Sequence, residues 1–135
     1  MPLDLPSDAA ASNIETLGVN VFNALSPGVA IYQPVDNGKN FRVIAMNPSA
    51  LQVSSACEKD VLGHLVTDAF PGAETMGFLD ALRRVQKSGE GELLPATYYA
   101  DEIRKGWFRN ELSLLPDGSI KSMYIDATQY VVARE

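Results

Sequence analysis

The stretch from 106 to 128, GWFRNELSLLPDGSIKSMYIDAT, most constrains the fold of this chain. Its first part alternates between two sets of side chains with the period of two that is typical of a strand. Asp117-Gly118 then supplies a pair that readily takes the positive φ angles of a tight turn. The return strand is predicted from Ile120 to Ile125. We therefore predict a long β-hairpin, which other elements must cover because two strands alone are not stable in water.

Composition narrows the classes of protein to consider. The 135 residues suit one domain with a single core, and the net charge of −6 argues against a nucleic-acid module, which normally has a basic face. A single cysteine, Cys57, cannot form an intrachain disulfide. Its presence agrees with a reducing compartment, so we expect a cytoplasmic protein. No apolar run approaches the roughly 20 residues of a membrane span, and no signal-peptide pattern is visible, so we expect no membrane contact.

Outside the hairpin, hydrophobic periodicity and turn residues predict further elements. Asn47-Pro48 is a typical helix start, and the range 75–87 has an apolar face with basic residues in its last turn. The order is β-β-α-α-α-β-β-β after a leading helix, which predicts an α+β fold with a five-stranded antiparallel sheet and helices on one face. The strands outside the hairpin are predicted at 29–33, 41–46 and 92–99, and the helices near 48–55, 66–70 and 75–87.

The first 25 residues are predicted to hold a loose lead-in and an amphipathic helix. Ser12 and Glu15 fit a capping box. The apolar stripe that includes Ile14, Leu17 and Val21 has two interpretations. The helix could pack on its own domain, or it could be a dimerisation helix.

Several segments resemble those of a PAS domain. The helix start at Asn47 and the segment ending in Leu62-Gly63 are similar to the first half of that fold. The end of the chain resembles its last hairpin, although Ala127 stands where the family usually has a larger aliphatic residue. The hairpin matches are Phe108-x-Asn110-Glu111-Leu112, Asp117-Gly118 and Asp126-x-Thr128.

The resemblance implies a PAS core over 26–128, followed at 129–135 by the start of a linker to an output domain. It also implies a sensory and dimerisation domain of a larger signal-transduction protein, such as a histidine kinase of a two-component system or a cyclic-dinucleotide enzyme. The domain itself would not be catalytic. Asp126 and Thr128 would fix the angle at which the chain leaves the sheet. The alternative is a standalone α+β protein that binds a hydrophobic ligand, or a small enzyme that uses the same cavity.

Strand parity predicts which side chains face the helices. A ligand, if one is bound, would lie between the sheet and the short helices, where a few polar groups meet an apolar wall. The sequence leaves open whether this space holds a small molecule or a packed core that serves protein interaction. The predicted lining is Asn110, Leu112, Ser122 and Tyr124 from the hairpin, with Phe78 and Leu82 from the long helix.

Cofactor and catalytic motifs are not found in the sequence. The long helix holds no histidine where haem-binding PAS domains have one, so we do not expect haem through His64. Cys57 lies outside any reactive-cysteine motif of the flavin-binding members and is interpreted as a partly buried filler, so covalent flavin is not expected either. No metal-binding cluster or phosphate loop is visible. The adjacent Asp101 and Glu102 are interpreted as solvated.

The outer face of the predicted sheet is partly apolar. By parity Trp107, Met123 and Ile125 lie opposite the pocket residues. A bare apolar sheet face requires a cover. We therefore expect a homodimer, with the leading helix lying on this face or crossing to the partner.

Overall fold

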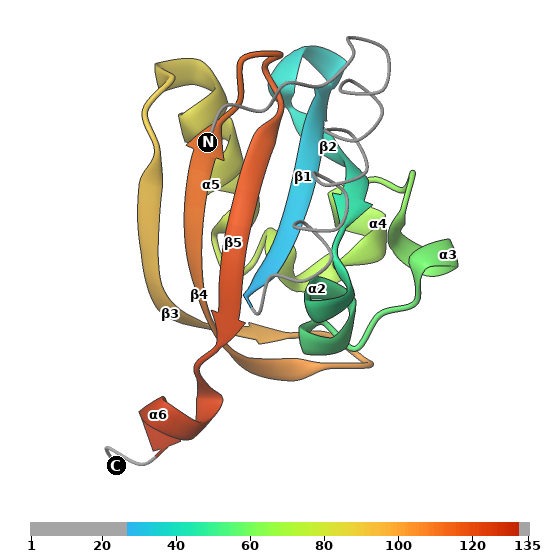
Figure 1. Cartoon of the computed structure of the whole chain (residues 1–135), viewed down its shortest axis with the longest axis vertical. Helices are drawn as coiled ribbons and strands as arrows, with labels where there is room; N and C mark the ends of the chain where they lie inside the picture. Colours follow the sequence, from blue (N-terminus) through green and yellow to red (C-terminus); the bar gives the residue numbers. More distant parts are fainter. Residues whose placement is uncertain (1–26, 133–135) are drawn as a thin grey trace, which may run out of the picture.

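The computed structural model describes residues 27–132, which form one antiparallel sheet of five strands covered on one face by short helices (Figure 1). The strand order is β2-β1-β5-β4-β3, so the last strand lies in the centre of the sheet beside the first. The predicted α+β architecture is confirmed. The strands are β1 (Gly28–Val35), β2 (Asn40–Met46), β3 (Glu92–Ala100), β4 (Lys105–Leu114) and β5 (Ile120–Asp126).

The helical layer lies between β2 and β3 in sequence and contains one helix more than the predicted order. The additional one is the short helix α3, just before Leu62-Gly63. A further short helix, α6, follows β5 and leaves the body of the molecule (Figure 1). The helices are α2 (Pro48–Val53), α3 (Glu58–Val61), α4 (Val66–Ala69), α5 (Phe78–Ser88) and α6 (Thr128–Val132), with single 3₁₀ turns η1 (Asp36–Gly38) and η2 (Pro71–Ala73).

The predicted hairpin is present as β4 and β5. Asn110 pairs with Tyr124 and Leu112 pairs with Ser122. At the turn, Gly118 has a φ of +89°, and the carboxylate of Asp117 accepts the backbone N–H of Ser119 at 2.9 Å. The turn residues thus satisfy the backbone where the two strands stop pairing.

One apolar core fills the space between the sheet and the helices. Helix α5 contributes Leu79 and Leu82, and the hairpin contributes Leu112 and Ile120, each at most 1% exposed. Burial of a single side chain of this kind stabilises the fold by roughly 1.5–3 kcal/mol. The core therefore fixes the distance between the two layers, and with it the shape of any space left between them.

Asn47 joins the sheet to the first core helix. Its Oδ1 accepts the N–H of Ala50 at 2.8 Å, as a helix N-cap does, and also the N–H of Val29 in β1 at 2.9 Å. Its amide group donates to the carbonyl of Pro27 at 3.2 Å. The predicted cap is present, and the link to β1 is an addition that the local sequence does not reveal.

Helix α5 begins at Phe78 and not at residue 75, because Gly77 adopts a φ of +88° that an α-helix cannot continue through. The predicted leading helix, with Ile14, Leu17 and Val21, lies outside the described residues. Among the described helices, none has the length and apolar composition that a membrane crossing requires.

Candidate functional site

A small cavity lies between the inner face of the sheet and the helical layer. Its volume is about 60 Å³. Strands β1, β3, β4 and β5 all contribute to it, together with the end of α2 and the start of α5. Its walls are mainly aromatic, with a few polar groups among them. The lining residues are Tyr32, Ser54, Phe70, Met76, Phe78, Tyr99, Arg104, Phe108, Asn110 and Tyr124.

Tyr124 connects the cavity to helix α2. Its hydroxyl donates to the carbonyl of Ala50 at 3.2 Å and lies 2.7 Å from the Oγ of Ser54. Burial raises the pKa of Tyr124 to about 12, while the Ser54 hydroxyl and the positive charge of Arg104 act in the opposite direction. Tyr124 is therefore a neutral, fixed wall of the cavity at ordinary pH.

Asn110 and Ser122 form a buried polar pair on neighbouring strands. The Oγ of Ser122 donates to Oδ1 of Asn110 at 3.0 Å. Ser122 is fully buried and Asn110 is 7% exposed. This pairing satisfies the amide oxygen. The Nδ2 group of Asn110 makes no hydrogen bond to any other residue in the described part of the chain.

The loop between β3 and β4 forms a second polar cluster beside the cavity. Asp101 accepts the backbone N–H groups of Ile103 and Arg104, each at 2.8 Å, the Nη1 of Arg104 at 3.0 Å, and the hydroxyl of Tyr99. The Asp101 side chain is only 6% exposed. The prediction that Asp101 is solvated is therefore wrong, because the loop folds around its carboxylate; Glu102 is exposed.

The charges in this loop are set by these contacts. Burial alone would raise the pKa of Asp101, but the hydrogen bonds from Tyr99 and the two backbone N–H groups and the charge of Arg104 lower it on balance. Burial, helped by the bond to Asp101, raises the pKa of Tyr99 to about 12. The cluster thus holds an ionised carboxylate, a neutral phenol and a guanidinium at neutral pH.

No family model matches the sequence, and no curated protein matches it. Solved structures do match in fold. A domain of the sensory box sensor histidine kinase/response regulator from Geobacter sulfurreducens has a TM-score of 0.66 at 14% identity, over 86% of this chain and 96% of that one. The PAS domain of BvgS from Bordetella pertussis has a TM-score of 0.62 at 15% identity, over 91% of this chain and 93% of that one. The PAS domain of an HTR-like protein from Haloarcula marismortui has a TM-score of 0.64 at 12% identity, over 89% and 97%.

The chain has the PAS fold. At identities this low the likeness establishes the fold and carries no information on ligand or partner, which must be argued from the site.

In this PAS fold, the predicted pocket residues fall into two groups. Asn110, Tyr124 and Phe78 line the cavity. Leu112, Ser122 and Leu82 are buried at 1% exposure or less but belong to the core beside it.

Several lining residues were not singled out from the sequence. Tyr32 belongs to β1, far from the hairpin in sequence, Tyr99 belongs to β3, which directly precedes the hairpin, and Arg104 comes from the loop between β3 and β4. A β-bulge between Leu94 and Thr97 explains why Tyr99 lies on the inner face of the sheet. Strict alternation from the inward-facing Leu94 would place Tyr98 on the inner face. Because of the extra residue in the bulge, Tyr98 is instead 46% exposed and Tyr99 is only 5% exposed. The Pro95 in this strand is the available sequence signal for such a bulge.

The residues considered for cofactors lie away from the cavity. His64 is exposed, and its ring lies 3.3 Å from the carbonyl oxygen of Lys59. Cys57 is exposed as well, so its interpretation as a partly buried filler is wrong. It stands at the N-cap of α3, and its side chain makes no capping hydrogen bond. Between residues 27 and 132 no group of three or more potential metal ligands gathers.

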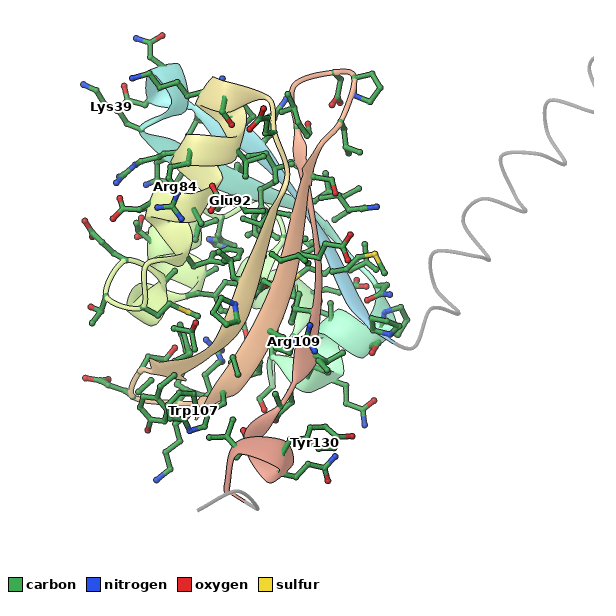
Figure 2. All side chains as sticks on the ribbon, turned by 90° about the vertical axis from the view of Figure 1, so that its left-hand side faces the viewer. Lys39, Arg84, Glu92, Trp107, Arg109 and Tyr130 are labelled. Atoms are coloured by element: carbon green, nitrogen blue, oxygen red, sulfur yellow. The ribbon has the colours of Figure 1, made fainter. Side chains whose placement is uncertain are left out.

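The outer face of the sheet carries the residues predicted to require a cover. Trp107 and Met123 are half-buried, and Ile125 is 38% exposed. A shallow hollow on this face is lined by Met123 and Ile125 together with Leu93, Arg109 and Pro27. Trp107 lies towards the α6 end of the molecule (Figure 2).

The exit of the chain from the sheet is fixed by local hydrogen bonds. Oδ1 of Asp126 accepts the N–H of Thr128 at 2.9 Å, and the Oγ1 of Thr128 accepts the N–H of Trp107 at 2.9 Å. The N–H of Ala127 donates to the carbonyl of Trp107 at 2.7 Å. The start of α6 is thereby tied to β4.

Proposed function

We propose that this chain is a sensory domain of the PAS type, that it belongs to a larger signal-transduction protein, and that it binds a small molecule. The observation that carries the proposal is the cavity between sheet and helices, where polar groups converge among aromatic walls. The similarity in fold to PAS domains of sensor proteins supports it.

The cavity is connected to the exit of the chain through a short covalent path. Tyr124 lines the cavity, and Asp126, two residues later in the same strand, bonds the first residue of α6. Any ligand that shifts Tyr124 therefore acts on the strand that leads out of the domain. In this proposal α6 begins a linker to an output domain, either a histidine kinase or a cyclic-dinucleotide enzyme, and the domain itself is not catalytic.

The proposal includes a homodimer formed through the outer face of the sheet. Large apolar side chains remain open to solvent there, with Leu93 72% and Ile125 38% exposed. A second copy of the chain, through its leading segment and its own sheet, would cover them. Ile14, Leu17 and Val21 remain the predicted contacts from that segment.

The sensory function is tested by filling the cavity in the parent protein. Phe108→Trp enlarges a side chain of the lining, whereas Lys87→Trp, on the exposed side of α5, is the matched control. We expect Phe108→Trp to alter the response of the output activity to its stimulus, and Lys87→Trp to leave it unchanged. Native mass spectrometry and visible absorption of gently purified chain identify any ligand carried along. An unaltered response in a folded Phe108→Trp protein would refute the sensory role of the cavity.

A further inference from the structure

Arg104 carries a buried hydrogen-bond donor without a partner. Its side chain is 12% exposed, and its guanidinium lies 5.1 Å from the ring centre of Phe70. Nη1 donates to Asp101 at 3.0 Å and to the carbonyl of Ala69 at 3.2 Å. The Nε of Arg104 has no hydrogen-bond partner among the described residues. An unpaired buried donor destabilises the fold, and more so when it is charged. We therefore expect this part of the structure to accept a partner that the described residues do not supply.

Two further groups of the same cavity are unpaired. The hydroxyl of Tyr32 and the Nδ2 of Asn110 make no hydrogen bond within the described part of the chain, although both residues are at most 7% exposed. The other polar side chains of the lining are occupied. Tyr124 bonds Ser54 and Ala50, and Tyr99 bonds Asp101. The groups left for a ligand are therefore chiefly donors.

Asp101 forms a salt bridge with Arg104 but does not itself line the cavity. Its two oxygens accept four hydrogen bonds, from two backbone N–H groups, a hydroxyl and Nη1. A carboxylate has about four acceptor positions, so none remains for another donor. The cavity lining itself contains no carboxylate. Nε itself is enclosed, so the donor that Arg104 can offer to a ligand is Nη2, which makes no hydrogen bond within the described part of the chain. The guanidinium is the only charged group among the residues that line this cavity.

The volume of the cavity and its apolar side chains limit which ligands it can bind. A space of about 60 Å³ accommodates roughly four to six water-sized groups. The walls opposite the polar groups are Phe70, Met76, Phe78 and Phe108. These residues favour a short alkyl chain and exclude a ligand of flavin or haem size. Arg104 also borders a surface hollow whose lining includes the carboxylates of Asp68, Asp101 and Glu102.

We propose that this cavity binds a short-chain monocarboxylate of about three carbons, whose oxygens accept from Arg104, Asn110 and Tyr32. The alkyl chain lies against Phe78 and Phe108. This assignment rests on the proposed sensory function and specifies its ligand class.

Titration calorimetry on the purified chain tests the assignment, with sodium propionate as the probe. Propionamide and propan-1-ol are the neutral controls of equal chain length. We expect propionate to bind at least about tenfold more tightly than propionamide, because only the anion makes a charge-assisted bond to the guanidinium.

Variants locate the site. Arg104→Gln should weaken propionate binding by at least about tenfold. Arg84→Gln is the matched control, because Arg84 pairs with Glu92 at 2.9 Å on the surface formed by α5 and β3 (Figure 2) and does not line the cavity. If Arg104→Gln does not fold, Tyr32→Phe serves instead. It keeps the ring that meets Phe78 edge-on at 5.6 Å, and it should weaken binding about threefold or more.

The outcomes separate this assignment from the sensory function. Equal or tighter binding of propionamide would refute the proposal that the ligand is an anion, but would leave the proposed small-molecule sensor in place. Absence of propionate binding at millimolar concentration overturns the ligand class, while the response of the Phe108→Trp parent decides the sensory function independently. Binding that Arg84→Gln weakens as much as Arg104→Gln places the ligand outside the cavity and refutes the proposal.

Discussion

The side-chain oxygens of Ser54 and Tyr124 lie 2.7 Å apart and join the end of α2 to the last strand across 70 residues of sequence. The contact is buried and lies in the wall of the cavity. It links the helical layer to the strand that continues into α6, so its energy bears on stability and, in the proposed function, on signalling.

Tyr124→Phe should destabilise the domain by about 1–3 kcal/mol, because it removes the bonds to Ser54 and to the Ala50 carbonyl and leaves both groups buried. Urea unfolding measures the difference. Tyr130→Phe is the matched control, since Tyr130 is 61% exposed, and it should change stability by less than about 0.5 kcal/mol. Equal effects of the two substitutions would show that the contact contributes nothing.

The buried Asp101 predicts a specific dependence of stability on pH. Its pKa is lowered in the folded chain, so its contribution is fully present above the ordinary pKa of aspartate, about 3.9, and is lost as pH falls through the lowered value. Asp101→Asn should reduce stability at neutral pH by about 3 kcal/mol, because it leaves Arg104 unpaired. Below pH 4 the two proteins should converge. Urea unfolding at several pH values measures this, and a constant difference down to acid pH would contradict it.

The sequence predicts best those structural features that depend only on residues close together in the chain. The β4–β5 hairpin and the cap at Asn47 are encoded by neighbouring residues, and both are found where the sequence places them. The link from Asn47 to Val29 depends on tertiary packing. Helix α5 begins three residues later than predicted, because Gly77 is a poor helix former and adopts a left-handed conformation.

The site was less predictable than the fold. Parity within the hairpin correctly brings Asn110 and Tyr124 to the inner face, because no bulge interrupts β4 or β5. Tyr99 is brought in by a bulge, and Tyr32 by the pairing of β1 with β5. Arg104 reaches the cavity because a loop folds around Asp101. The position of Tyr32 depends on tertiary pairing, whereas the bulge and the Asp101–Arg104 loop are local features that simple strand alternation does not predict.

The proposed dimer can be tested on the outer face of the sheet. Ile125→Asp should shift the chain from dimer to monomer, because a charge buried in an apolar contact costs several kcal/mol, while the fold survives since Ile125 is 38% exposed in the single chain. Ile103→Asp, at a loop residue 77% exposed, is the control and should leave the dimer intact. Light scattering reports both. A monomeric wild-type chain at high concentration would exclude the dimer, although the leading segment could still cover its own sheet.

The two ends of the β4–β5 hairpin allow a controlled test of signal exit. At the turn, Asp117 accepts the N–H of Ser119 at 2.9 Å, and at the exit Asp126 accepts the N–H of Thr128 at the same distance. The two bonds are alike in chemistry, and loss of either costs only about 0.5–1.5 kcal/mol, so both alanine variants should remain folded. They differ in position, because Thr128 also bonds the N–H of Trp107 and so fixes the direction of α6 against β4. We therefore expect Asp126→Ala to change the output activity of the parent protein, with and without stimulus, while Asp117→Ala leaves it unchanged. Parent activity and a melting curve of the domain are measured for each variant. Normal regulation in a folded Asp126→Ala protein would mean that this bond does not couple the sheet to the linker.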